Sequence, residues 1–368
     1  MRIFYAASDS GDAVGLKGSK AWYYNLYLPL VDIGNEVIRF DYDLTPHFRN
    51  LDPSKPKHKA FIDKNRPRLE EELLKQIRRA HLKKPINLFF SYFYSACCSP
   101  EVIKEISKMG ILAVNWYCNA SYQFHLVREI APAYDYCLVP EKFKFDDYKK
   151  VGAHPIYLQE AANPNIYKPY NLPKKYEVTF IGQRYGDRAE YIQYLLDRGI
   201  DVRVWGPGWK RKVGLRGLLF EKMRDVKRTL LNQPRIKDLQ QISKRPIVNI
   251  ELVKMFSRSK INLGFSSCGE THRTEKRILQ IRLRDFEIPM SGGFYMVEYM
   301  EELQEFFEIG KEIVCYTDPQ DLADKIKYYL KHDSKREAIR KAGYERCQRE
   351  HTWQKRFEMA FKEMGLGI

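Results

Sequence analysis

Several patterns that commonly identify a chemistry are missing from this chain of 368 residues. It has no CxxC pair, no HExxH helix and no P-loop, so common zinc sites, zinc proteases and P-loop NTPases are not indicated. The GxGxxG fingerprint of dinucleotide enzymes and the GxSxG elbow of serine hydrolases are also absent. No apolar run approaches the roughly 18 residues that a membrane-spanning helix needs.

The seven cysteines are odd in number, and none are spaced as metal-ligand pairs. A disulfide framework is therefore not favoured, and we expect a cytoplasmic protein, with peripheral association at the membrane as an open alternative. The cysteines are best interpreted as small apolar core residues. The eight histidines show no metal-ligand spacing either, so we expect no metal site.

The net charge of +16 is concentrated in two segments. Residues 45–84 carry 12 basic and 5 acidic side chains, and residues 210–246 carry 12 basic and 3 acidic ones, which gives net charges of +7 and +9. Local basic surfaces indicate anionic partners: a membrane face, phosphorylated ligands or nucleic acid. Solvated basic segments without a partner are an equal alternative. For 210–246 we expect contact with anionic lipid or with a polyanionic acceptor.

Strand and helix patterns alternate through both halves of the chain, which predicts an α/β protein with doubly wound parallel sheets. A proline-rich stretch, 163–175, predicts an interdomain linker, after which the pattern restarts. Asp318 followed by Pro319 marks a helix start, and two more helices are predicted over 334–349 and 352–365.

Ligands bind such sheets at the carboxyl ends of the strands, so the loops that follow strands hold the candidate residues. After the first strand come Gly11, Gly15 and Gly18, where backbone N–H groups can approach a phosphate or sugar. A flexible loop is an equal alternative.

The second half of the chain offers a cationic loop. Gly182 and Arg184 end a strand, and Arg188 opens the next helix. Two guanidinium groups at a helix N-terminus suit a diphosphate, with an exposed arginine pair as the alternative. Gly206 and Gly208 lie between two tryptophans, an arrangement that suits a planar base or an ordinary turn.

A fourth candidate is the segment 282–293. Arg284 and Glu287 are three residues apart and share a helix face. They form either a surface ion pair or a donor site, in which Glu287 accepts ribose hydroxyls and the arginines, Arg282 included, hold phosphate.

The segment 282–330, RLRDFEIPMSGGFYMVEYMEELQEFFEIGKEIVCYTDPQDLADKIKYYL, followed by EHTWQKR, resembles the C-terminal signature of the CgeB-like (spore maturation protein) glycosyltransferases. YEVTFIGQRYGDR and VRVWGPGW resemble the opening of the same domain, and KAWYYNLYLPLVDIGNEVIRFDYD resembles the N-terminal domain. The resemblance covers most of the chain and is strongest over 260–356.

That family is similar to the family-4-type glycosyltransferases of the GT-B fold. The resemblance implies two Rossmann-like domains that face a cleft, no metal and no cofactor, with a nucleoside-diphosphate sugar such as a UDP-sugar as co-substrate. The expected parts are an acceptor-side domain over 1–165, a linker over 166–175, a nucleotide-sugar-binding domain over 176–349 and a C-terminal helix over 350–368 that crosses back to the first domain.

The resemblance also implies roles for individual residues. Glu287 matches the second Glu of the E-x7-E donor motif, which binds the ribose, whereas the first Glu falls at Leu279 and is missing. Arg184 and Arg188 lie near the positions of the basic diphosphate pair. The full expectation is catalysis by Arg188, Arg284 and His125 (on the acceptor side), donor binding by Gly182, Arg184, Gly206, Arg282, Glu287 and Gly292, and an acceptor-side loop with Gly11, Gly15 and Gly18.

We therefore predict a metal-independent glycosyltransferase that transfers a hexosyl group to a hydroxyl of a glycan, lipid-linked glycan or protein. Leu279 and the lack of an acidic residue near Asn119 motivate an alternative, a sugar-nucleotide-binding module without catalysis. A nucleic-acid-binding protein is less supported, because the basic runs lack interleaved aromatic residues. A nicotinamide dehydrogenase shares the fold class but lacks the glycine fingerprint.

Overall fold

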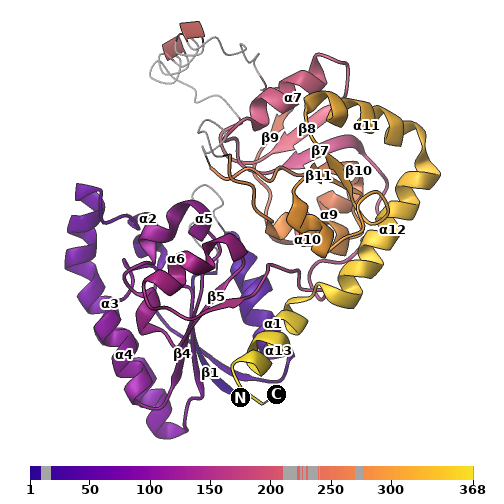
Figure 1. Ribbon diagram of the computed structural model, residues 1–368. Helices are drawn as coiled ribbons and strands as arrows, with labels where there is room; N and C mark the ends of the chain where they lie inside the picture. Colours follow the sequence, from indigo (N-terminus) through magenta and orange to yellow (C-terminus); the bar gives the residue numbers. More distant parts are fainter. Residues whose placement is uncertain are drawn as a thin grey trace. The chain divides into compact units, whose positions relative to one another are not determined.

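The computed structural model describes residues 1–9, 18–209, 241–269 and 277–367, with 222, 223, 226, 229, 230 and 239 in between. The chain forms two compact units, Met1–Asn163 with His351–Ile368 and Pro164–Glu350. Each unit is built on a six-stranded parallel sheet with helices on both faces (Figure 1). None of the described helices combines the length and the apolar composition that a bilayer crossing requires.

The sheet of the first unit has the order β2-β1-β3-β4-β5-β6, and all its pairs are parallel. Its strands read as short runs of apolar residues because both faces of a parallel sheet are covered. The bounds are β1 (Arg2–Ala6), β2 (Glu36–Arg39), β3 (Leu88–Ser91), β4 (Leu112–Trp116), β5 (Tyr136–Val139) and β6 (Pro155–Tyr157).

The helices of the first unit lie on two faces of this sheet. The bounds are η1 (Tyr23–Tyr27, a π-helical turn), α1 (Leu28–Asp32), α2 (Thr45–Arg49), α3 (Pro56–Lys83), α4 (Pro100–Lys108), α5 (Ala120–Gln123), η2 (Phe124–Leu126), η3 (Ala131–Ala133), η4 (Lys142–Lys144), α6 (Phe145–Lys150) and α13 (Trp353–Glu363). Helix α1 packs against α13, and α3 packs against α4 on the other side (Figure 1).

The C-terminal helix belongs to the first unit. The N–H of Ala162 donates to the carbonyl of His351 at 3.2 Å, and the N–H of Trp353 donates to the carbonyl of Ala162 at 3.3 Å. The ring of Trp353 packs edge-on against that of Trp116, with ring centroids 5.3 Å apart. The aromatic core of the first unit therefore includes a residue from the far end of the chain.

The sheet of the second unit has the order β12-β11-β10-β7-β8-β9. Its strands are β7 (Tyr176–Ile181), β8 (Val202–Trp205), β9 (Ser243–Lys244), β10 (Ser259–Leu263), β11 (Tyr295–Glu298) and β12 (Val314–Tyr316). The first strand of this unit, β7, thus lies between the second, β8, and the fourth, β10. This is the strand arrangement of nucleotide-binding Rossmann folds. The strand order reverses between β7 and β10, although the two strands are parallel. Ligands bind such sheets beyond the carboxyl ends of the strands at that point.

Helices α7 (Arg188–Leu196), α9 (Asn249–Arg258), α10 (Leu283–Met290), α11 (Pro319–Lys331) and α12 (Asp333–Glu350) complete the second unit, with the short turn η6 (Glu301–Glu305). The predicted start of α11 is confirmed, because the Asp318 carboxylate accepts from the N–H groups of Gln320 and Asp321 at 2.8 and 2.9 Å. The two further helices predicted before the C-terminus are α12 and α13.

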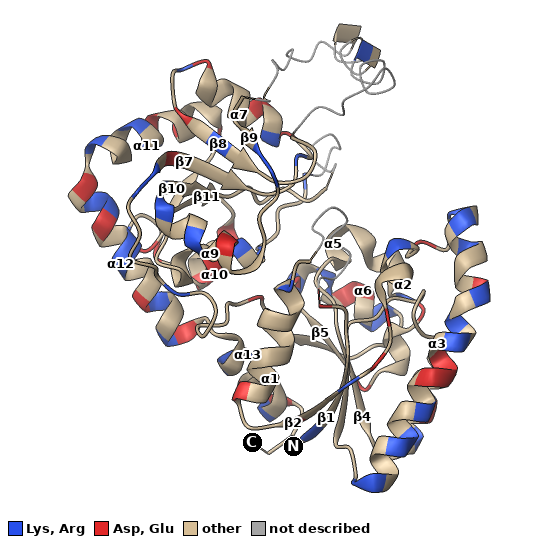
Figure 2. Cartoon of the chain, turned by 180° about the vertical axis from the view of Figure 1, so that it is seen from behind, with Lys and Arg blue, Asp and Glu red and all other residues tan. Residues whose placement is uncertain are grey.

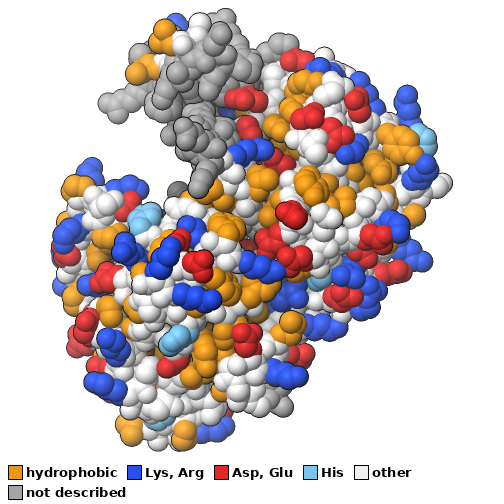
Figure 3. Space-filling model, viewed as in Figure 1, with side chains coloured by type: hydrophobic (Ala, Val, Ile, Leu, Met, Phe, Trp, Pro, Cys, Tyr) orange, Lys and Arg blue, Asp and Glu red, His pale blue; other side chains and the backbone are white. Residues whose placement is uncertain are grey.

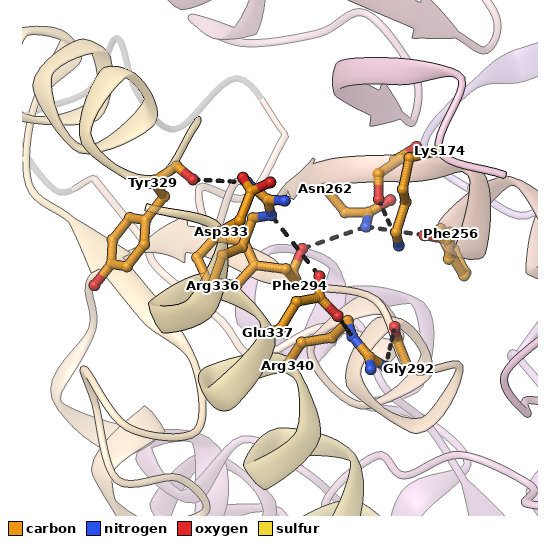
Figure 4. Close-up of polar contacts among 11 residues, drawn as sticks. Lys174, Phe256, Asn262, Gly292, Phe294, Tyr329, Asp333, Arg336, Glu337 and Arg340 are labelled. Carbon is orange, nitrogen blue, oxygen red and sulfur yellow. Dashed lines mark hydrogen bonds and ion pairs between the residues drawn. The ribbon is translucent and has the colours of Figure 1, made fainter. Parts of the chain in front are cut away.

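Helix α12 is fixed to the rest of the second unit by arginines (Figure 4). Arg340 donates to the carbonyl of Gly292 at 3.2 Å and pairs with Glu337 at 2.6 Å. Arg336, only 4% exposed, donates to the carbonyl of Tyr329 at 2.8 Å. These contacts join α12 to the end of α11 and to the turn that follows α10.

The expected linker does not run free of the two units. Residues 164–175 belong to the second unit, where the N–H of Tyr170 donates to the hydroxyl of Ser257 at 3.0 Å and the N–H of Lys175 to the carbonyl of Arg258 at 2.8 Å. Ser257 and Arg258 both belong to α9, so this stretch packs against that helix. Helix α3 begins at Pro56 and continues through Pro67.

Gly343 provides a test of how closely α12 packs. A Cβ there would collide with the carbonyl oxygen of Glu312. In a helix interior alanine is normally more stable than glycine by about 1 kcal/mol. We expect Gly343→Ala to lower the free energy of unfolding by about 1–3 kcal/mol instead, measured in urea. Ala338→Gly, at an exposed position of the same helix, is the control and should cost about 1 kcal/mol. A Gly343→Ala protein as stable as wild type would contradict this packing.

Candidate functional site

The loops after β7 and β8 contact each other through their glycines. Gly206 has φ +147°, and a Cβ there would collide with the carbonyl oxygen of Gly182. The N–H of Gly182 donates to the carbonyl of Trp205 at 2.9 Å, and that of Arg184 donates to the carbonyl of Pro207 at 3.0 Å. The glycines therefore allow two neighbouring strands to end in one joined pair of loops.

Both tryptophans of the second loop are core residues. Trp209 is 1% exposed, packs against Phe180 and donates its indole N–H to the carbonyl of Gly182 at 2.7 Å. Trp205 is 4% exposed and packs against Tyr176. Of the two interpretations of this loop, the structure supports turn and core packing rather than a floor for a base.

Arg188 is a buried cation at the carboxyl edge of this sheet. It opens α7 with 6% of its surface exposed. Its guanidinium donates to the carbonyl of Gln183 at 3.0 Å and to the hydroxyl of Tyr185 at 2.6 Å. It also lies over the rings of Tyr185, Phe180 and Phe265, at 3.7, 5.3 and 5.7 Å from their centroids. Aromatic faces and one carbonyl thus stabilise the charge.

No carboxylate of the described residues forms an ion pair with Arg188. Burial lowers its pKa, and the positive charge of nearby Arg282 lowers it further. Arg282 donates to the carbonyl of Ser267 at 3.0 Å, and the Ser267 hydroxyl lies 3.5 Å from a carboxylate oxygen of Asp187. Two guanidinium groups from separate elements therefore approach the same edge, an arrangement that favours an anion.

The N-terminus of α10 is fixed by a buried carboxylate. Asp285 accepts the N–H of Arg282 at 2.8 Å and the hydroxyl of Tyr295 at 2.6 Å. The Tyr295 hydroxyl lies where a Cβ of Gly264 would be, so only glycine fits at the end of β10. Burial raises the pKa of Asp285 to about 6. This network holds the helix that carries Arg282, Arg284 and Glu287.

Arg284 and Glu287 form the expected ion pair, one turn apart on α10. Glu287 is fully buried, whereas the Arg284 side chain is 31% exposed and lies 5.7 Å from the ring centroid of Phe256.

The sequence interpretation missed a group of charges beside Arg188. Arg277 bridges Asp187, at 2.7 Å, and Glu298, the last residue of β11. Glu298 also accepts the N–H of Ser266 at 3.2 Å. Burial raises the pKa of Glu298 while Arg277 counters that shift. These carboxylates could have been found from their places in the chain, because Asp187 lies in the loop after β7 and Glu298 ends β11.

Other candidates lie elsewhere. Gly292 is at the far end of α10, with φ +63°, against Pro169 and α12. His125 is exposed on η2 of the first unit, and Gly18, with φ +79°, is exposed after β1. Gly11 and Gly15 lie outside the described residues, as does most of 210–246. Within the described ranges, no group of three or more His, Cys, Asp or Glu side chains is arranged to hold a metal ion.

One family model and several solved structures are similar to this chain. Residues 188–361 match the model of a family described as Glycosyl transferase-like. Sucrose-phosphate synthase from Thermosynechococcus elongatus has a TM-score of 0.61 at 13% identity, with 99% of both chains covered. Anabaena HepE in complex with UDP-glucose has a TM-score of 0.60 at 13% identity, with the same coverage. For α,α-trehalose 6-phosphate synthase from Burkholderia multivorans the values are 0.56 and 11%, with 99% of this chain and 98% of that one covered.

No curated protein matches the chain by sequence. The structural likeness over the whole chain defines the fold as GT-B, as the family resemblance implied. The family match itself covers residues 188–361, which is most of the second unit and most of α13.

The burial of Asp285, which holds the N-terminus of α10, can be tested by varying the pH. Its pKa rises from 3.8 to about 6 in the folded protein, so the neutral carboxyl stabilises the fold most below about pH 4. That stabilisation is lost as the pH rises through 6. We expect the unfolding free energy of wild type to fall relative to Asp285→Asn by up to about 3 kcal/mol between about pH 4 and 7, measured by urea unfolding.

The control for this test is Asp201→Asn, which removes an exposed carboxylate of the same unit. Asp201 pairs with Arg203 at the surface, so its removal should change the unfolding free energy by less than about 1 kcal/mol. A difference between wild type and Asp285→Asn that does not change with pH would contradict the assignment.

Proposed function

We propose that this protein transfers a hexosyl group from a nucleoside-diphosphate sugar to an acceptor hydroxyl without a metal ion. The observation that carries the proposal is Arg188, a buried guanidinium with no carboxylate partner among the described residues and with Arg282 beside it. A buried cation without a counterion is energetically unfavourable, and a bound anion would remove that cost. The leaving group of such a reaction is a diphosphate, which is an anion of this kind.

The reaction chemistry fits these residues. Cleavage of a glycosyl–phosphate bond develops negative charge on the leaving diphosphate, which Arg188, Arg184, Arg282 and Arg284 would stabilise in place of a divalent ion. The N-terminus of α7 adds its dipole to the same charge. Anabaena HepE, whose fold is similar, is known in complex with UDP-glucose, which supports a UDP-sugar as the donor.

Glu287 is our proposed ribose ligand. Its carboxylate is buried, held by Arg284 and placed on the helix that begins at the sheet's carboxyl edge. The counterpart expected eight residues earlier is Leu279, whose backbone pairs with Ser267. The sugar is therefore held by other groups. We propose that Gly182 and Gly206 contact the donor at the edge that carries Arg188, and that His125 and the loop of Gly11, Gly15 and Gly18 serve the acceptor side. Gly292 lies at the far end of α10, away from these cations, and is not part of the proposed donor site.

Arg188→Met tests the diphosphate site without removing bulk. Because methionine replaces a buried cation by an apolar chain of similar length, we expect the protein to be at least as stable as wild type. Affinity for UDP-glucose or another preferred donor, chosen by a thermal-shift screen, should fall about 10–100-fold by calorimetry.

The matched control is Arg198→Met. Arg198 also lies over a tyrosine ring, that of Tyr194, but near the other end of α7. It should bind the donor as wild type does. Unchanged donor affinity in Arg188→Met would refute the diphosphate site, whereas saturable donor binding without transfer over an acceptor panel would favour the binding-module alternative.

Metal independence is tested directly. Transfer by the enzyme should be unchanged by EDTA and by added Mg²⁺, because cationic side chains neutralise the leaving group. An activity that EDTA abolishes and Mg²⁺ restores would show that a divalent ion takes part.

A further inference from the structure

Helix α3 presents an outward side that the proposed reaction does not use. Ile62, Leu69, Leu73 and Ile77 are 0–4% exposed and face the sheet of the first unit. At 100° per residue, the positions opposite this buried side are those near Lys57.

Five basic residues follow one line along that side. Lys57, Lys64, Arg68, Lys75 and Arg79 are spaced 7, 4, 7 and 4 residues apart, close to whole turns of the helix, and all five are exposed. We call this line the α3 ridge. It spans about 33 Å at the helical rise of 1.5 Å per residue. Figure 2 shows Lys and Arg positions at both ends and along α3, with acidic positions between them, and Figure 3 shows basic side chains at the surface on the same edge of this unit.

The ridge is where the positive charge of this helix is least compensated. Other basic residues of α3 have acidic partners: Lys59 pairs with Asp63 at 2.7 Å, and Arg78 pairs with Glu105 of α4. On the ridge, Lys75 pairs with Glu72 at 3.0 Å.

The remaining four members of the ridge form no ion pair with any described residue. They are Lys57, Lys64, Arg68 and Arg79. Glu71 is the acidic residue on the same side of the helix. Part of the positive excess that the sequence shows over 45–84 therefore lies along one line of α3.

We propose that the α3 ridge is a docking surface for an anionic lipid bilayer. The ridge is one exposed line along a single helix, so its charges face the same side and can approach a plane together, where basic side chains are attracted by acidic headgroups. Leu82, three residues beyond Arg79, is 87% exposed at the end of the ridge and supplies an apolar side chain to enter the interface. Phe61 is the one Phe, Tyr or Trp of α3, is half-buried and is not one of the ridge residues, so the ridge itself has no aromatic ring of this kind on which nucleic-acid bases stack.

The test is co-sedimentation of the full chain with vesicles of phosphatidylcholine alone or with added phosphatidylglycerol, without donor. Wild type should bind only the anionic vesicles, and added salt should weaken the binding. The triple variant Lys57→Gln, Lys64→Gln, Arg68→Gln should bind at least tenfold more weakly. The matched control, Lys327→Gln, Lys331→Gln, Lys341→Gln, removes the same charge from the exposed surface of α11 and α12 and should bind nearly as wild type.

Three outcomes would overturn the proposal. The first is no preference of wild type for anionic vesicles. The second is an equal effect of the two triple variants, which would show that net charge or another segment, such as 210–246, governs binding. The third is ridge-dependent binding to a soluble polyanion, such as single-stranded DNA, without vesicle binding. Because donor is absent from the assay, each outcome is independent of the proposed transferase reaction.

Discussion

The parallel pairing of β7 with β8 on one side and β10 on the other is the constraint on which the second unit depends. It brings the loops after three strands to one edge, although they are separated by long stretches of sequence. Gly206 against Gly182, and Gly264 against the Tyr295 hydroxyl, are positions where the edge has no room for a side chain. The polar groups of the candidate site are therefore attached to a rigid frame.

The arginines at this edge of the sheet differ in how many carboxylates neutralise their charge. Arg277 is shared by two carboxylates, Asp187 and Glu298, and Arg284 is paired with Glu287. Arg188 has aromatic faces and neutral oxygens instead. A site of this kind keeps one positive charge available for a ligand while its neighbours stay neutralised, and the buried Asp285 keeps α10 in place beside it.

Much of the fold was predictable because it rests on local signals. Buried parallel strands are apolar runs, Asp318 and Pro319 encode a helix start, and the alternation of elements predicts doubly wound sheets. The ion pair of Arg284 with Glu287 follows from helical spacing alone. Arg277 and Glu298 escaped notice because their partner, Asp187, is distant in sequence, and no spacing rule connects them. The packing of 164–175 on α9 was missed because prolines indicate irregular backbone but not what that backbone contacts.

The sequence alone determined the class of the elements, their order and the types of residue at the strand ends, because these depend on neighbours within one or two turns. Tertiary structure decided which of those residues meet. It buried the two tryptophans beside Gly206, separated Gly292 from the cations, and set Arg188 next to Arg282. The reason is that burial and the distance between charges depend on how strands and helices pack, and residues far apart in the chain become neighbours only when the sheet is assembled.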